Sequence, residues 1–152
     1  MNQLSIKEEL YKQCLAFIDN RLLTVKNTMH EIQQSLLSET KSSAGDKHET
    51  GRAMLQLERE KAGNQLAEII KIKENISKIS LESSSNKIHL GSIVHTSKAN
   101  YYIAISAGVI KVDDTVFYAI SPITPIAKLL IGKTVNETIS FRSQSFTITS
   151  IH

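Results

Sequence analysis

Two carboxylate side chains, Asp46 and Glu49, stand three residues apart, where one long helical pattern gives way to another. In the first turn of a helix, residues three apart are neighbours on the surface, so both carboxylates point to the same side. Oxygen donors of this kind suit Mg²⁺, which is bound by one or two carboxylates and keeps several waters. Two carboxylates alone bind Mg²⁺ weakly. We therefore predict a half-site, hereafter the tip carboxylates, whose remaining ligands come from a partner.

The same spacing has an interpretation that needs no further function. An Asp at a helix start with a Glu three residues later nearly matches the capping box, which satisfies free backbone N–H groups. On spacing alone the cap is favoured, and the two interpretations can hold together because a cap also fixes the direction of the carboxylates. His48 lies between the acids, but a transition-metal site there lacks a second soft ligand. Lys47 and Arg52 are either solvated charges or contacts to phosphate.

Two long helices must position these carboxylates. Residues 2–39 contain neither Pro nor Gly, which predicts a helix of roughly 50–55 Å at about 1.5 Å per residue. Its apolar residues are spaced alternately four and three apart, as in a coiled-coil seam: Tyr11, Leu15, Ile18, Leu22, Val25, Met29, Ile32 and Leu36. A second helix is predicted from Asp46 to about Leu81, with apolar positions at Met54, Leu57, Ala62, Leu66, Ile69, Ile72, Ile76 and Ile79. The small and breaking residues at 41–45 predict an antiparallel hairpin with the acids at its far end.

The second half of the chain changes its hydrophobic period. Short β-branched or aromatic runs between turn signals predict about five strands, at residues 88–94, 101–105, 116–120, 135–141 and 146–151. Thr124 as N-cap, Pro125 at the first helical position and Gly132 as a stop predict one short helix. We therefore expect an α+β fold: an antiparallel coiled-coil hairpin at residues 1–81, a linker at 82–86, and a small antiparallel β domain with one short helix at 87–152.

Composition argues against several classes of function. The 18 basic and 15 acidic residues form no dense basic stripe, so autonomous binding of DNA or RNA is not expected. No stretch approaches the roughly 20 apolar residues that span a bilayer, and the N-terminus lacks the pattern of a signal peptide. The single Cys14 allows no disulfide within the chain and is interpreted as a buried structural thiol. We therefore expect a cytoplasmic protein without a membrane partner.

Together these patterns resemble the bacterial Gre transcript-cleavage factors, GreA and GreB. Residues 45–49 read Gly-Asp-Lys-His-Glu, where that family has an acidic G-D-x-x-E loop between two long antiparallel helices. Residues 120–135 are similar to the family's C-terminal signature, S-P-x-S-P followed by a short helix ending in L-L-G-K and then a strand. The second block is fairly specific because it combines two prolines, a helix and a glycine stop in fixed order. The first block is weak alone and much stronger beside it.

The resemblance implies an FKBP-like β domain that docks on RNA polymerase at the rim of its secondary channel. The hairpin would enter that channel, where the tip carboxylates act in catalysis by helping to hold the second Mg²⁺ of the polymerase and to orient a water that hydrolyses backtracked RNA. The residues assigned to partner binding are Lys47, Arg52, Ser121, Pro122, Pro125 and Lys133. The chain would be no enzyme itself and would hold no cofactor stably. As a monomer it would reach the RNA 3′ end only through the polymerase, and DNA at most indirectly.

Other functions stay open at this point. The family pattern has an acidic and an aromatic residue where this chain has Arg52 and Ala53. A regulator of the same architecture that occupies the channel without promoting cleavage is therefore the main alternative. A prolyl isomerase is suggested only by the FKBP-like analogy, and most of the aromatic residues it would use are needed for the core. In a fourth alternative, an oligomeric scaffold, the seam would pair between chains.

Overall fold

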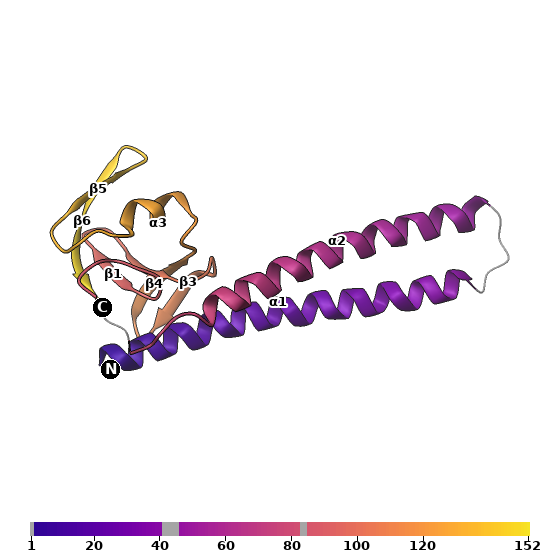
Figure 1. The fold of residues 1–152 in the computed structure, drawn as a ribbon, viewed down its shortest axis with the longest axis horizontal. Helices are drawn as coiled ribbons and strands as arrows, with labels where there is room; N and C mark the ends of the chain where they lie inside the picture. The colour runs from indigo at the N-terminus through magenta and orange to yellow at the C-terminus, as the bar shows by residue number, and fades with distance from the viewer. Residues whose placement is uncertain (1, 41–45, 83–84) are drawn as a thin grey trace. The chain divides into compact units, whose positions relative to one another are not determined.

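The computed structural model describes residues 2–40, 46–82 and 85–152, which form two compact units. The hairpin unit comprises Ile18–Glu74, and the β unit comprises Met1–Phe17 together with Asn75–His152. Helix α1 (Gln3–Thr40) contributes to both units, and nearly all of helix α2 (Asp46–Ile76) belongs to the hairpin unit (Figure 1). The domain boundaries predicted from the sequence stay a prediction. In these units the first turns of α1 belong with the strands.

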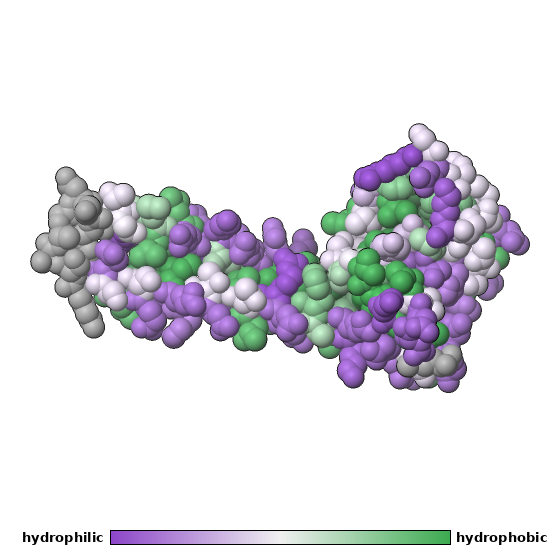
Figure 2. Space-filling view, turned by 180° about the vertical axis from the view of Figure 1, so that it is seen from behind, coloured by the Kyte–Doolittle hydropathy of each residue, from purple (hydrophilic) through white to green (hydrophobic). Residues whose placement is uncertain are grey.

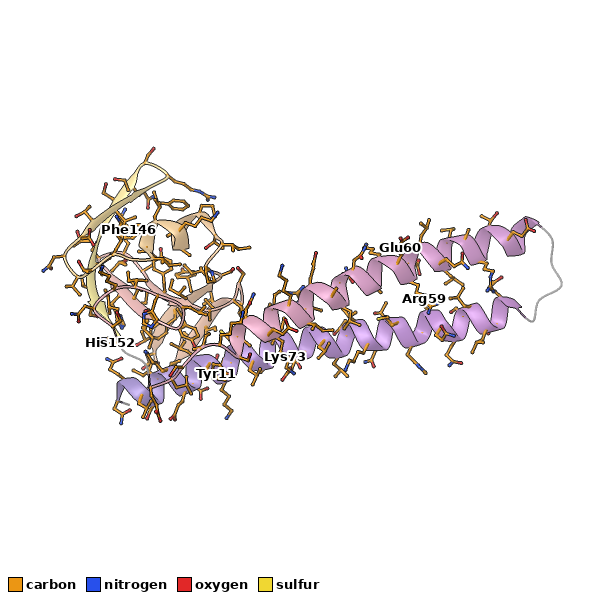
Figure 3. All side chains as sticks on the ribbon, in the orientation of Figure 1. Tyr11, Arg59, Glu60, Lys73, Phe146 and His152 are labelled. Carbon is orange, nitrogen blue, oxygen red and sulfur yellow. The ribbon has the colours of Figure 1, made fainter. Side chains whose placement is uncertain are left out.

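The hairpin unit consists of two antiparallel helices, as the sequence predicts (Figure 1). Both helices contain few breakers and carry apolar residues at coiled-coil spacing, so each can bury one stripe along the other. The predicted seam residues that are buried in this unit are Ile18, Val25, Ile32, Leu36, Ala62 and Ile69. Lys73 Nζ of α2, labelled in Figure 3, lies 2.7 Å from Asp19 Oδ1 of α1. This ion pair lies outside the seam and agrees with the same antiparallel register.

Two seam positions predicted on α2 are wrong. Met54 and Leu57 have exposed fractions of 60% and 66%. Leu55 takes the inward position instead, packing with Met29 against the buried side chains of Ile32, Leu36 and Ala62. A shift of one residue rotates a helical position by roughly 100°, which moves Met54 and Leu57 off the seam. Arg59 and Glu60, labelled in Figure 3, follow and are exposed. Figure 2 accordingly shows hydrophobic residues on the surface of this unit.

Helix α2 ends at Ile76, five residues before the predicted end. The N–H groups of Lys78 and Ile79 donate to the carbonyl oxygens of Asn75 and Ile76 at 3.2 and 3.1 Å. Such bonds to a residue three positions back form the tight turn that commonly closes a helix. Ile79 is buried, and a Cβ added to Gly91 would come within 2.9 Å of its Cγ2. Ile79 therefore packs within the β unit rather than extending the seam.

The β unit is a six-stranded sheet in the order β3-β4-β2-β1-β6-β5. Its strands are β1 (Ile93–Thr96), β2 (Asn100–Ile103), β3 (Gly108–Val112), β4 (Thr115–Ile120), β5 (Thr138–Phe141) and β6 (Gln144–Ile151). All neighbouring pairs are antiparallel except β2 and β4, which run parallel. The α+β prediction of a helical hairpin and a mostly antiparallel sheet with one short helix is confirmed. Strand β3 was not predicted, and residues 88–90 form no strand.

Helix α3 (Pro125–Leu130) covers one face of the sheet. Thr124 caps it as predicted, because its hydroxyl accepts a hydrogen bond from the Ala127 N–H at 3.4 Å, and Gly132 ends it with a φ of +86°. Ala127 and Leu130 of α3 are wholly buried. They join a core that the strands and the segment before them supply with Ile88, Val94, Ile103, Ile139, Phe146 and Ile148.

The start of α1 lies against the face of the sheet opposite α3. Tyr102 and Phe117 point to that face and are buried, as are Leu10 and Cys14 of α1. Burial raises the pKa of Tyr102, and Cys14 is close enough to raise it further. Burial also raises the pKa of Cys14 to about 12, so the thiol stays protonated and poorly reactive. The prediction that Cys14 is a buried structural thiol is confirmed.

Candidate functional site

Helix α2 begins at Asp46, the residue at which the sequence predicts its start. The backbone therefore places Asp46 and Glu49 in the first turn of α2, where the positive end of the helix dipole favours negative charge. The side chain of Glu49 is exposed. The side chains of Asp46, Lys47 and His48 lie outside the described residues. The cap and the Mg²⁺ half-site therefore both stay predictions.

A third carboxylate lies near this turn. A Cβ added to Gly51 would be 3.6 Å from Glu39 Oε1, so the Glu39 carboxylate of α1 lies beside the backbone of α2. Negative charge close to the first turns of α2 adds to the charge that Glu49 supplies. Sequence reasoning missed Glu39 because only the register between the two helices brings it to Gly51. No spacing within one helix indicates that proximity.

The described residues contain no group of three or more His, Cys, Asp or Glu side chains that could hold a metal ion. The exposed Glu49 carboxylate is nevertheless an oxygen ligand of the type that Mg²⁺ prefers. Whether Glu49 shares such an ion with Asp46 and a partner stays a prediction. Arg52 is half-buried, and Ala53 is exposed.

The residues predicted to bind a partner near α3 form a hydrogen-bonded turn. The Ser121 hydroxyl accepts a hydrogen bond from the Ile123 N–H at 3.3 Å, and the Ser121 carbonyl accepts one from the Thr124 hydroxyl at 2.8 Å. The Ser121 N–H donates to Ser106 Oγ at 3.3 Å. Pro125 then occupies the first turn of α3. Ser121 thus shapes this turn, and whether it also contacts a partner stays a prediction.

Lys133 lies apart from that turn, after the end of α3. Its carbonyl accepts a hydrogen bond from the Ile88 N–H at 2.9 Å. The Thr134 N–H donates to Glu137 Oε2 and is the main cause of the lowered pKa of Glu137, to which the Lys133 cation also contributes. Lys133 is half-buried within this arrangement. The structure therefore brings Ser121, Pro122 and Pro125 together but places Lys133 elsewhere.

Ile123 is the residue that sequence reasoning missed at the turn. Its exposed fraction of 78% is the highest of any large hydrophobic residue that the structure describes. It lies between Pro122 and Pro125, whose rings fix φ and reduce the freedom of the turn. An apolar residue between two closely spaced prolines was the available signal. A single exposed apolar side chain is common on protein surfaces, so a contact of Ile123 with a partner stays a prediction.

No helix among the described residues is long and apolar enough to cross a membrane. No protein-family model matches the chain, and a comparison with curated proteins found no match. A solved structure of the transcription factor Gfh1 is similar, with a TM-score of 0.34 and 18% sequence identity, over 93% of this chain and 92% of that chain. Both values are low, and a functional assignment has to rest on the residues of this chain.

Proposed function

We propose that this chain is a Gre-like transcription elongation factor that binds RNA polymerase and stimulates cleavage of backtracked RNA. The observation that carries the proposal is the pair of acids in the first turn of α2, at the junction of two long antiparallel helices, with the Glu49 side chain exposed. The proline-flanked turn at residues 121–125, which resembles the second block of the same family, supports it from the other unit. The pair of acids is a weak signal alone, and the second block is fairly specific.

The proposal requires only carboxylate ligands from the chain itself. Metal-assisted hydrolysis of a phosphodiester uses two cations roughly 3.5–4 Å apart, which stabilise the attacking and leaving oxygens. In this proposal the polymerase supplies the reacting centre and its Mg²⁺. Asp46 and Glu49 add carboxylate ligands for a second ion and accept a hydrogen bond from the attacking water. The chain alone would neither cleave RNA nor hold a cofactor.

The remaining predicted contacts serve to hold the factor in place. Lys47 lies between the tip carboxylates and Arg52 lies three residues after Glu49, and both would neutralise phosphate or acidic groups of the complex. The β unit would dock on the polymerase surface, with the turn of Ser121 and Pro122 as one contact. The helices then need only length and a defined direction to deliver the carboxylates.

A second candidate is a regulator that binds the polymerase without promoting cleavage. Arg52 and Ala53 favour it, because they stand where the resembled family has an acidic and an aromatic residue. A cation at that position would reduce the negative charge available to a second Mg²⁺. Both candidates use the same binding surface, so a test must measure binding and cleavage separately.

The test is a double substitution, Asp46→Asn with Glu49→Gln, in stalled elongation complexes with Mg²⁺. The wild-type chain should shorten the RNA, and the variant should lose this activity while binding the polymerase as before. The matched control is Glu58→Gln with Glu60→Gln, which removes two exposed acids further along α2 and should leave cleavage unchanged. Binding without shortening by the wild type would select the regulator. Undiminished cleavage by the Asp46/Glu49 variant would contradict the assigned chemistry.

A further inference from the structure

The apolar stripe between α1 and α2 has a charged layer at its end. Leu55 of α2 packs against the buried cluster that contains Leu36 of α1, which makes the two residues neighbours in the antiparallel seam. In the alternation of three and four residues, the next inward position on α1 is Glu39, and the preceding one on α2 is Arg52. Because the helices are antiparallel, both steps lead toward the first turn of α2. Glu39 and Arg52 therefore belong to the last layer of the seam.

Two distances agree with this register. A Cβ added to Gly51 would lie 3.6 Å from Glu39 Oε1 and 3.7 Å from Glu39 Oε2, so the carboxylate lies beside the residue that precedes Arg52. Further along the hairpin unit, Asp19 Oδ1 and Lys73 Nζ are 2.7 Å apart, and Asp19 precedes Glu39 by nearly as many residues as Lys73 follows Arg52. Glu39 and Arg52 are both half-buried. Such burial is expected of a charged side chain whose aliphatic part covers the end of an apolar seam.

Arg52 also has an acid within reach on its own helix. Glu49 lies three residues earlier on α2, and side chains three apart are neighbours on a helix surface. A guanidinium that paired with Glu49 would compete with Mg²⁺ for one of the tip carboxylates. The Glu49 side chain, however, is exposed and takes part in no hydrogen bond or ion pair among the residues that the structure describes. Glu39 and Glu49 are thus alternative partners for one cation.

We propose that Glu39 is a positioning residue, which draws the Arg52 guanidinium into the last layer of the seam and leaves Glu49 available to Mg²⁺. The proposal rests on the proposed function and deepens it, because it assigns a role to the third carboxylate near the first turn of α2. It also explains how an arginine at position 52 is compatible with a second Mg²⁺. A guanidinium has five N–H donors, so Arg52 can pair with Glu39 and still contact a phosphate.

The pair is tested in the free chain by urea unfolding of the hairpin unit, followed by far-ultraviolet circular dichroism. Glu39→Gln and Arg52→Met should be coupled about two- to fivefold in the equilibrium constant of unfolding at low salt, as for an ion pair near the surface. Glu49→Gln and Arg52→Met should be nearly additive in the wild-type chain and become coupled once Glu39→Gln is present. The control, Glu31→Gln, removes an exposed acid about two turns earlier on α1 and should not couple with Arg52→Met.

Cleavage in stalled elongation complexes tests what the pair does. At a saturating concentration of the chain, Glu39→Gln should raise the Mg²⁺ concentration for half-maximal shortening of the RNA about two- to fivefold, because Arg52 then pairs with Glu49. The affinity of the chain for the polymerase should stay the same. In an Arg52→Met chain, Glu39→Gln should have no further effect on the Mg²⁺ requirement, whereas a loss of hairpin structure would affect both chains alike. Glu39→Asp, which keeps the charge, should restore most of the Mg²⁺ response.

The outcomes separate this proposal from the proposed function. If the wild-type chain does not bind the polymerase or does not shorten the RNA, the proposed function fails, and the unfolding experiment still decides whether Glu39 and Arg52 form a pair. If the wild type shortens the RNA but Glu39→Gln leaves the Mg²⁺ requirement unchanged, or raises it equally in the Arg52→Met chain, the positioning role is wrong and the proposed function stands. Coupling of Glu39→Gln with Lys47→Met in place of Arg52→Met would also overturn the proposed pair.

Discussion

The hairpin unit buries one stripe along each helix, whereas the β unit buries both faces of its sheet. At the end of the hairpin nearest the tip carboxylates, the buried cluster is Ile32, Leu36 and Ala62. In the β unit, Tyr102 on one face and Leu130 against the other are wholly buried. A thin core depends on few contacts and tolerates change between them, while a sheet covered on both sides constrains shape and backbone together. The unit proposed to carry chemistry is thus the more permissive of the two.

The two units can be followed separately in solution. The four tyrosines are Tyr11, Tyr101, Tyr102 and Tyr118, and all belong to the β unit. Tyrosine fluorescence therefore reports the unfolding of the β unit. Far-ultraviolet circular dichroism reports mainly α1 and α2, the long helices. Substitutions in either unit can be compared by the transition that they move.

The largest difference is expected for leucines. Leu130→Ala removes a wholly buried side chain between α3 and the sheet and should lower the free energy of unfolding of the β unit by about 2–5 kcal/mol. Leu57→Ala removes a side chain that is 66% exposed, and the hairpin transition should move by no more than about 0.5 kcal/mol. Urea unfolding with both probes measures the two values. Equal losses would mean that the hairpin is not the permissive unit.

The next effect concerns Gly91 in the β unit. Gly91 has a φ of +92°, and an added Cβ would lie 2.9 Å from Ile79 Cγ2. Gly91→Ala should therefore destabilise the β unit by about 1–3 kcal/mol, through the positive φ and the clash together. Tyrosine fluorescence in urea measures the loss.

The same substitution in an Ile79→Ala chain separates the loss caused by the clash from the loss caused by the positive φ. In an Ile79→Ala chain the clashing methyl group is absent, so Gly91→Ala should cost less there, although the cost of the positive φ remains. The same loss in both backgrounds would show that the backbone conformation alone requires glycine at position 91.

The fold was predictable where one local signal dominates. The four-and-three spacing predicted the hairpin, and Thr124, Pro125 and Gly132 predicted α3 with its cap and stop. On α2 the signal was ambiguous, because Met54, Leu55 and Leu57 are all apolar and only packing against α1 selects Leu55. Strand β3 was missed because its turn to β4 holds Asp113 at a φ of +54° without the glycine that usually marks such a loop.

The candidate site shows the same limit. Asp46 and Glu49 were found because they belong to one helix turn, where a separation of three residues in the sequence places side chains next to each other. Glu39 was missed because it approaches Gly51 from the other helix. Val109, Tyr118 and Tyr101 were not recognised as neighbours on the sheet, because the parallel pairing of β2 with β4 brings them together across a chain crossover. The sequence pattern could not predict contacts that depend on the register between separate helices or strands.

Gly63 in the hairpin unit should respond in the opposite direction to Gly91. It lies inside α2, and an added Cβ would meet no atom within 4 Å. Gly63→Ala should therefore stabilise the hairpin by about 0.5–1 kcal/mol, because glycine loses more conformational freedom in a helix than alanine does. Thermal unfolding followed by circular dichroism measures the gain. A loss of stability would show that this position must bend or approach another group.

The smallest effect is expected from the ion pair of the hairpin unit. Lys73 Nζ and Asp19 Oδ1 are 2.7 Å apart, and although that oxygen is itself buried, each side chain as a whole is 45% exposed, so nearby water and salt weaken the attraction. A double-mutant cycle with Asp19→Asn and Lys73→Met should give a coupling of about 0.2–1 kcal/mol at low salt. The coupling should nearly vanish at about 1 M salt, where the screening length is about 3 Å. Lys71→Met, at an exposed position two residues away, serves as the control. A coupling that is larger and independent of salt would mean that this pair is shielded from water, and that the hairpin relies on a fixed polar contact as well as on its apolar stripe.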